Sequence, residues 1–372
     1  MDAFFDGVRA AAAVAKEHAE DVDRQARFPQ EAVDALRDTS ALSALVDGVS
    51  LREVAQACQV LARSCSASAM VFAMHQIEVA CLVQHESPWT KEYVGDLRRD
   101  QRLIASVTSE IGTGGDMGRS VAAVETVDDG TCTFTKQAPT VSYGEHADDY
   151  LTTVRRAPDA EAGDQVAVLH LGSQTTMTKT GTWDPLGMRG TCSPGFTVTA
   201  EFGPEQVLAA PFTQIAAETM VPVSHLLWSH LWVGIAVEAF DRAKRSVKAA
   251  GVQGSSVRGQ RLSELHGELA ATRAQLAEAL DRYEREVAEP GRPALSTYGA
   301  ALRHNVLKTS VSRSVASVCH GALEVCGIAG FRNDSPFSIG RLLRDSLSAS
   351  LMVSNDRLHE TNAALLMVVK EG

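Results

Sequence analysis

One short stretch, Ser106–Gly118, has the residue types and spacing of a turn that holds a ligand. It reads SVTSEIGTGGDMG and follows an apolar approach, LIA. Thr108 and Ser109 supply short hydroxyls, and the dense glycines, Gly114 and Gly115 among them, permit positive φ angles and close approach of a second group. Such a turn either reverses the chain or holds a flat or anionic ligand. Spacing alone does not choose between these two.

Two common nucleotide-binding motifs do not fit this turn. The chain lacks strand–helix–strand alternation, and the turn lacks the Gly-Lys-Ser/Thr ending of a P-loop. A metal site is not predicted, because the cysteines are dispersed and no two form a CxxC pair. We interpret the cysteines as buried structural thiols: Cys58, Cys65, Cys81, Cys132, Cys192, Cys319 and Cys326.

Composition and charge exclude other classes of function. A formal net charge of −11 without a run of Lys or Arg argues against nucleic-acid binding, which needs a basic face. Asp2 and Asp6 lie where a signal peptide would carry positive charge, so we expect a cytoplasmic protein. The longest apolar stretch, Thr219–Phe240, contains His225, His230 and Glu238. These polar groups favour a central core helix over a membrane span.

Hydrophobic periodicity divides the 372 residues into three segments. Residues 1–101 are rich in alanine and have helical spacing, with Pro29 at a helix start. Residues 102–212 contain short β-rich pieces between turn clusters, which is typical of an antiparallel barrel or sandwich. Residues 213–372 return to helix and predict an antiparallel bundle. We therefore expect a multidomain α+β protein.

Two apolar stripes indicate which helix faces are buried. Val54, Cys58 and Leu61 follow the i, i+4, i+7 spacing of one helical face. A second stripe runs along the segment that precedes the EPGRP turn: Leu262, Leu265, Leu269, Leu276, Leu280 and Tyr283.

Four patterns occur in order along the chain. They are VTSEIGTGGD (107–116), SYGEHADDYL (142–151), GTWDPLGMRGTCSPGFTV (181–198), and CGIAGF (326–331) followed by IGRLLRD (339–345). They resemble the T-E-x-x-A-G-S-D, I-T-N-G-x-x-A-D, G-W-R-G-S-D-T, and G-G-x-G-Y with L-x-R-D motifs of the acyl-CoA dehydrogenase superfamily. The resemblance implies an N-terminal α-helical domain, a middle antiparallel β-barrel and a C-terminal antiparallel four-helix bundle. It also implies FAD between the barrel and the bundle.

The resemblance further implies which residues hold the flavin. Thr108 and Ser109 would hydrogen-bond the pyrimidine edge of the ring, since a hydroxyl both donates and accepts. Gly114 and Gly115 would lie beside the pyrophosphate. Because Gly115 replaces a family serine, a backbone N–H would have to supply that hydrogen bond.

Two departures concern the ring face and the adenine end of the cofactor. Ser142 falls where a family threonine approaches flavin N5, and Thr140 falls where a tryptophan often covers the ring. Glu324 and Gly327 occupy a family Gln-x-x-Gly-Gly turn that binds the adenine end across a subunit interface. The resemblance therefore also implies a homodimer or homotetramer.

The catalytic carboxylate of the family is missing. In acyl-CoA dehydrogenases a glutamate removes the α-proton of a thioester while a hydride passes to the flavin. Counting from the R-D motif places Val353 at the usual position of that glutamate, and Ser224 at the position used by a second subgroup. Four nearby side chains are our candidates for the catalytic part: Asn355, Ser354, His225 and His75.

These observations leave three hypotheses for the function. The first is FAD-dependent oxidation of an acyl or aminoacyl thioester, carried on coenzyme A or an acyl carrier protein, with an electron-transfer partner or O2 as acceptor. The second is a reduced-flavin-dependent monooxygenase, although SASLMVSND lacks the His-rich patch usual in that class. The third is a catalytically silent flavoprotein or scaffold of the same fold.

Overall fold

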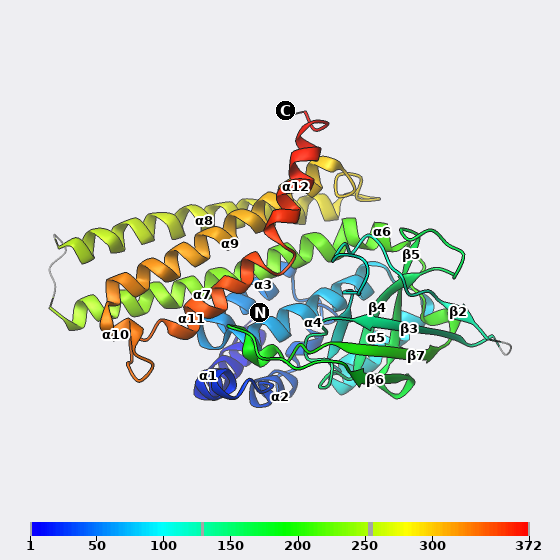
Figure 1. Cartoon of the computed structure of the whole chain (residues 1–372), viewed down its shortest axis with the longest axis horizontal. Helices are drawn as coiled ribbons and strands as arrows, with labels where there is room; N and C mark the ends of the chain where they lie inside the picture. The colour runs from blue at the N-terminus through cyan, green and yellow to red at the C-terminus, as the bar shows by residue number, and fades with distance from the viewer. Residues whose placement is uncertain (1, 128–129, 252–255, 371–372) are drawn as a thin grey trace.

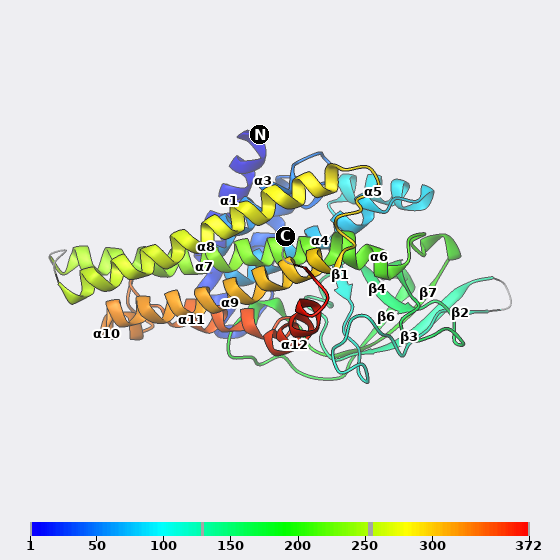
Figure 2. The ribbon, with the colours of Figure 1, turned by 90° about the horizontal axis from the view of Figure 1, so that it is seen from above.

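The chain forms a helical body and a β-domain that lie side by side (Figure 1). The computed structural model describes residues 2–127, 130–251 and 256–370. The N-terminal helices pack with the long C-terminal helices, and the strands gather at one end of the molecule (Figure 2). The predicted order of helical, β and helical parts is confirmed.

Five helices form the N-terminal part. They are α1 Asp2–Gln25, α2 Gln30–Asp38, α3 Leu51–Ser64, α4 Ser66–Gln84 and α5 Pro88–Asp100. α3 begins with a capping box, in which Ser50 N donates to the Glu53 carboxylate at 2.9 Å and the Ser50 hydroxyl accepts from Glu53 N. Val54, Cys58 and Leu61 are fully buried, as their spacing predicted.

The middle part forms two sheets. Its strands are β1 Ile104–Val107, β2 Glu125–Thr126, β3 Cys132–Ala138, β4 Asp149–Arg155, β5 Gln165–Leu171, β6 Thr175–Lys179 and β7 Phe196–Phe202. One sheet has the order β1-β4-β5 and the other the order β2-β3-β7-β6. The sequence signal missed β6, because its threonine-rich residues are mostly exposed and it pairs only with β7 at a sheet edge.

One strand pair differs from the antiparallel pattern that we expected. β1 and β4 run parallel, with Ile104 opposite Asp149. Asp149 is buried at the start of β4, and its carboxylate accepts from Arg102 Nε at 2.5 Å and Arg102 Nη2 at 2.7 Å. The Tyr93 hydroxyl of α5 donates to the same carboxylate at 2.6 Å. This buried cluster joins the starting ends of both strands, so they run in the same direction.

Three long helices form most of the C-terminal part. They are α7 Val221–Ala249, α8 Val257–Ala288 and α9 Tyr298–Cys326, and α7 follows α6 Phe212–Ile215 through one π-helical turn. Five members of the second predicted stripe are buried, and Leu262 is half-buried at its end: Leu265, Leu269, Leu276, Leu280 and Tyr283. α7 is the predicted central helix, with Trp232 fully buried.

Short helices follow α9 and join the bundle to the other two parts. They are α10 Ile328–Phe331, α11 Gly340–Leu347 and α12 Asn355–Leu366. Asp345 of α11 is buried and accepts from Met188 N at 2.7 Å. Arg344 donates to Leu186 O at 2.8 Å and pairs with Asp23 of α1. Two of the sequence patterns, GTWDPLGMRG and LLRD, therefore meet here.

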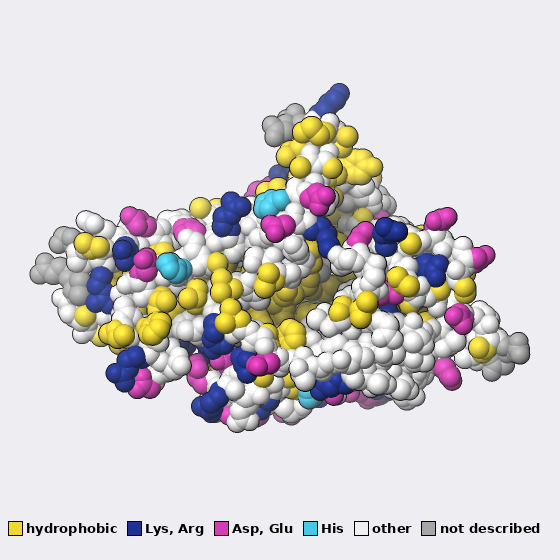
Figure 3. All heavy atoms as spheres, in the orientation of Figure 1, with side chains coloured by type: hydrophobic (Ala, Val, Ile, Leu, Met, Phe, Trp, Pro, Cys, Tyr) yellow, Lys and Arg dark blue, Asp and Glu magenta, His cyan; other side chains and the backbone are white. Residues whose placement is uncertain are grey.

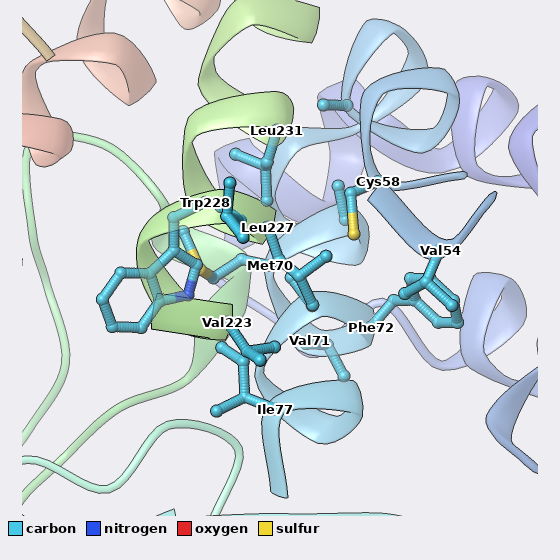
Figure 4. Packing of buried hydrophobic residues seen from close by; sticks show 14 of the residues in the cluster. Val54, Cys58, Met70, Val71, Phe72, Ile77, Val223, Leu227, Trp228 and Leu231 are labelled. Atoms are coloured by element: carbon cyan, nitrogen blue, oxygen red, sulfur yellow. The ribbon is translucent and has the colours of Figure 1, made fainter. Parts of the chain in front are cut away.

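Two helices are long and apolar enough to span a membrane by composition: Ser66–Gln84 and Phe212–Ala249. In the structure 89% and 94% of their most apolar windows are buried in the protein. Figure 4 shows side chains of α4 and α7 packed against each other and against Val54 and Cys58 of α3. This packing is that of core helices.

Candidate active site

A hollow separates the helical body from the β-domain, below α12 (Figure 3). Apolar side chains line its floor in that view. The Trp228 indole points away from the core side chains of α3, with Met70 beside it (Figure 4). Met74, one turn beyond Met70 on α4, is the one residue between Ser66 and Leu82 that is not buried. We take this hollow as the candidate ligand site.

The glycine-rich turn after β1 has the conformation that its composition predicts. Gly114 and Gly115 have φ angles of 63° and 80°, which few other residues adopt. Ser109 Oγ donates to Thr140 O at 2.6 Å, so these two predicted cofactor residues lie together. Glu110 turns into the β-domain, where its carboxylate accepts from Ala122 N at 2.6 Å. It is therefore part of the support for the turn.

Arg357 reaches the glycine turn from α12. Its Nη2 donates to Gly114 O, and a Cβ built on Gly115 would lie 2.8 Å from Arg357 Nη1. Among the described residues no carboxylate forms an ion pair with this guanidinium. Arg357 therefore has donors free for an anion at the turn.

Ser142 ends a short chain of hydroxyl groups. Ser193 Oγ donates to Ser142 Oγ at 2.9 Å, and Thr191 Oγ1 lies 2.9 Å from Ser193 Oγ. Because Ser142 accepts this hydrogen bond, its own O–H is available to another partner. Ser142 is half-buried, so such a partner can reach it.

Neither of the two positions where the family carries its catalytic base holds a carboxylate in this chain. Ser224 is buried on α7, and Val353 lies in the loop before α12 with a φ of 48°. The buried Lys308 ammonium donates to Val353 O at 2.7 Å and to Asn355 Oδ1 at 2.8 Å. Burial lowers the pKa of Lys308 to about 8. These two hydrogen bonds from Lys308 fix the loop that precedes α12.

Asn355 and Ser354 stand at the start of α12. Asn355 Nδ2 donates to Ser312 Oγ at 2.9 Å while its oxygen accepts from Lys308. Ser354 occupies the N-cap position without a side-chain cap hydrogen bond. The Asn355 amide is therefore engaged at both ends within the protein.

Both candidate histidines are buried, neutral and hydrogen-bonded. Ile104 N donates to His75 Nδ1 at 3.1 Å, and the opposite ring nitrogen lies 2.8 Å from Leu42 O. His225 Nδ1 lies 3.0 Å from His304 O. Burial lowers the pKa of His75 to about 4 and that of His225 to about 3. Neither ring has the exposure or the pKa of a base acting near neutral pH.

Replacing Asn355 by alanine should destabilise the bundle by about 1–3 kcal/mol, because the Lys308 ammonium loses one of its two acceptors inside the protein. Urea denaturation of the two proteins measures the difference. Asn333→Ala, at an exposed position, is the matched control and should leave the midpoint unchanged. An Asn355→Ala protein as stable as the control would show that the Lys308 contact contributes nothing.

Several solved structures are similar to this one over nearly the whole chain. FMN-bound TdsC from Paenibacillus sp. A11-2 is similar with a TM-score of 0.87 and 19% identity, over 99% of this chain and 97% of that one. Butyryl-CoA dehydrogenase from Megasphaera elsdenii has a TM-score of 0.82 and 17% identity, over 99% and 98%. Methanesulfinate monooxygenase MsuC from Pseudomonas fluorescens has a TM-score of 0.82 and 18% identity, over 98% and 97%. No family model matches the sequence, and a search of curated proteins finds no match.

The chain has the acyl-CoA dehydrogenase fold. The resemblance drawn from the four sequence patterns is thus confirmed at the level of the fold. The hollow lies between the two parts that, by that resemblance, enclose a flavin.

Within this acyl-CoA dehydrogenase fold, Glu324 and Gly327 lie apart from the other predicted cofactor residues. They sit at the end of α9 next to α10, at the opposite end of the helical body from the β-domain (Figure 1). Glu324 is exposed and lies 3.7 Å from Arg261. The structure therefore does not bring these two residues together with the glycine turn within one chain.

Three residues near or behind the candidate elements were not among those predicted from the sequence: Arg357, Lys308 and Glu78. The one available signal was for Glu78, which is the single charged residue in the apolar helix 66–84. Within the described ranges, no group of three or more His, Cys, Asp or Glu side chains is placed to hold a metal ion.

Proposed function

We propose that the protein is a flavin-dependent oxidoreductase whose cofactor ring lies in the hollow between the β-domain and the helical body. The glycine turn with Arg357 carries the proposal, since backbone N–H groups and a guanidinium without a carboxylate partner suit a phosphate. A bound flavin would supply two-electron redox chemistry. Thr108, Ser109 and Ser142 would orient its ring through their hydroxyls.

Of the oxidoreductase classes, we propose a reduced-flavin-dependent monooxygenase first. Val353 and Ser224 stand at both positions where an acyl-CoA dehydrogenase would carry its base, and a valine and a serine cannot remove an α-proton. TdsC, a dibenzothiophene monooxygenase, and MsuC have this fold. The missing base therefore favours monooxygenation over oxidation of a thioester. A monooxygenase of this kind needs a reductase partner and O2.

Oxidation of an acyl thioester, on coenzyme A or an acyl carrier protein, is the second candidate. Its support is the likeness to butyryl-CoA dehydrogenase over nearly the whole chain. In that case Asn355, Ser354 or His225 would have to contribute at the reacting carbon, although the hydrogen bonds of Asn355 and His225 favour positioning roles. Anaerobic bleaching of the flavin by a thioester would support this candidate against the first.

The apolar floor of the hollow favours an uncharged substrate with an apolar ring or chain. Apolar side chains line this floor, and apolar surface suits such a group (Figure 3). Product analysis with 18O2 tests the monooxygenase directly, because the label enters the product only if O2 is the oxygen source.

Glu324 and Gly327 bear on the choice between FAD and FMN, because by the resemblance their turn binds the adenine end, which FMN lacks. We propose FAD with its adenine end held by a second copy in a homodimer or homotetramer. TdsC is a neighbour that holds FMN. Chromatography of the flavin released from the purified protein identifies the cofactor, and FMN in a monomer would contradict this arrangement.

Replacing Arg357 by alanine should weaken flavin binding about 10- to 100-fold, the effect of losing a hydrogen bond to a charged group. Fluorescence titration with FMN and with FAD measures the dissociation constants. Arg332→Ala, at an exposed guanidinium paired with Asp334, is the matched control.

Gly115→Ala and Gly114→Ala provide a second matched pair. Both place a Cβ on a residue with positive φ, and only at Gly115 does that Cβ meet the Arg357 guanidinium. Gly115→Ala should therefore lower flavin affinity more than Gly114→Ala. If Arg357→Ala, Arg332→Ala, Gly115→Ala and Gly114→Ala all bind flavin with equal affinity, the glycine turn is not part of the flavin site.

A further inference from the structure

A groove between α8 and α9, which run side by side along the helical body (Figure 1), is separate from the candidate active site. The residues that line it all belong to these two helices, so it shares none with the glycine turn. Its volume is about 190 Å³. One buried water needs only ~10–15 Å³, so the groove has room for a larger molecule.

His304 of α9 lines this groove and is 7% exposed. Its ring meets the Tyr283 ring of α8 edge to face, with 6.2 Å between the ring centroids. Its Nε2 has no hydrogen-bond partner among the residues that the structure describes. Burial lowers the pKa of the imidazole to about 4, so the ring is neutral near pH 7. A neutral imidazole donates from one nitrogen and accepts at the other, so Nε2 needs a partner of either kind.

Glu286 of α8 lines the same groove and has a second unpaired atom. Its Oε1 accepts from Arg303 Nη2 at 2.6 Å. Its Oε2 is buried and has no hydrogen-bond partner in the described part of the chain. Because most buried polar atoms are paired, two unpaired atoms on the residues of one groove indicate a ligand that completes them.

The charged side chains that line the groove balance one another. Glu286 pairs with Arg303, and Glu278 accepts from Arg282 Nε at 2.9 Å. A charged ligand would lose its hydration here without gaining an unpaired counter-charge. The groove therefore suits a neutral molecule.

Further donors and apolar surface lie in the same groove. Arg303 donates to Glu286 through Nη2, and a guanidinium has additional N–H groups for another acceptor. The buried side chains of Tyr283 and Leu307 supply apolar surface from α8 and α9. A ligand that fits this lining has N–H donors, an acceptor beside them and an apolar body.

We propose that the groove between α8 and α9 binds a small neutral molecule that has a primary carboxamide group. The amide N–H groups donate to Glu286 Oε2 and His304 Nε2, and the amide oxygen accepts from Arg303. The apolar body packs against Tyr283 and Leu307. This site needs no flavin and does not depend on the proposed function.

Isothermal titration of the full-length protein with benzamide tests the site, because benzamide joins a primary carboxamide to one apolar ring. The wild type should bind it at millimolar concentration. Glu286→Gln should weaken binding about 10- to 100-fold, and His304→Phe about 3- to 10-fold, the effects of losing a hydrogen bond to a charged and to a neutral group. Glu264→Gln, the same change at an exposed position of α8, is the matched control and should bind as the wild type does.

Benzoate is the matched control ligand, since it keeps the ring but is an anion without N–H groups. It should not bind measurably, and benzoate that binds as well as benzamide would overturn the carboxamide assignment. Wild-type protein that takes up no benzamide at millimolar concentration would show that only water fills the groove, and this also overturns the proposal.

The two variants separate this groove from every other place where an aromatic amide could bind. If Glu286→Gln and His304→Phe both bind benzamide like the wild type, the amide lies elsewhere and the proposal is wrong. His304→Phe removes a nitrogen that has no partner in the described structure, so the fold should tolerate it, and it gives the answer if Glu286→Gln does not fold. Benzamide binding without flavin binding would refute the proposed function alone.

Discussion

Glu78→Gln should stabilise the folded protein by about 3 kcal/mol at pH 7. Burial disfavours the charged form of the carboxyl and raises its pKa from the ordinary value of 4.5 to about 8 in the fold. At pH 7 the unfolded chain releases this proton and the folded chain retains it. The interval of about 2.5 pH units costs the fold about 1.4 kcal/mol per unit, and glutamine avoids this cost.

The sign of this effect makes it testable against pH. A raised folded pKa stabilises the fold fully below about pH 4.5, and this contribution is lost as the pH rises through about 8. The stability difference between variant and wild type should therefore be small near pH 4 and grow up to about pH 8. Buried histidines titrate in both proteins and cancel in the difference. A difference in urea midpoint that does not vary with pH would contradict a protonated Glu78.

Gly187→Ala should destabilise the protein by about 3 kcal/mol or more. A Cβ on Gly187 would lie 2.3 Å from Arg344 O and 2.7 Å from Asp345 N, and these backbone atoms cannot turn aside. The loop cannot withdraw without breaking the hydrogen bond from Met188 N to the buried Asp345. The β-domain would then lose its attachment to α11.

Gly181→Ala is the matched control for this prediction. Gly181 begins the same loop, and a Cβ there would have no atom nearer than Gly195 N at 3.9 Å. Thermal denaturation of both variants should give a near-native midpoint for Gly181→Ala and a clearly lower one for Gly187→Ala. Similar midpoints would show that the contact of this loop with α11 can relax at little cost.

The limits of sequence reasoning are visible in particular residues. Spacing alone predicted the burial of Val54, Cys58 and Leu61, since a helical face of fixed period must turn toward the core. It also predicted the positive φ angles of Gly114 and Gly115. By contrast, Asn355 was chosen by counting from the R-D motif, and counting does not reveal that Lys308 and Ser312 occupy its amide.

Local periodicity and residue type were enough to predict the order of helical and β parts, the buried helix faces, the glycine turn and the missing carboxylates. Three features depend on tertiary contacts: the parallel pairing of β1 with β4, the approach of Arg357 to Gly114, and the burial of the Glu78 carboxyl. These contacts join residues far apart in the chain, such as Gly114 and Arg357, or residues on two different elements. No local pattern encodes them, since they depend on how whole helices and strands pack.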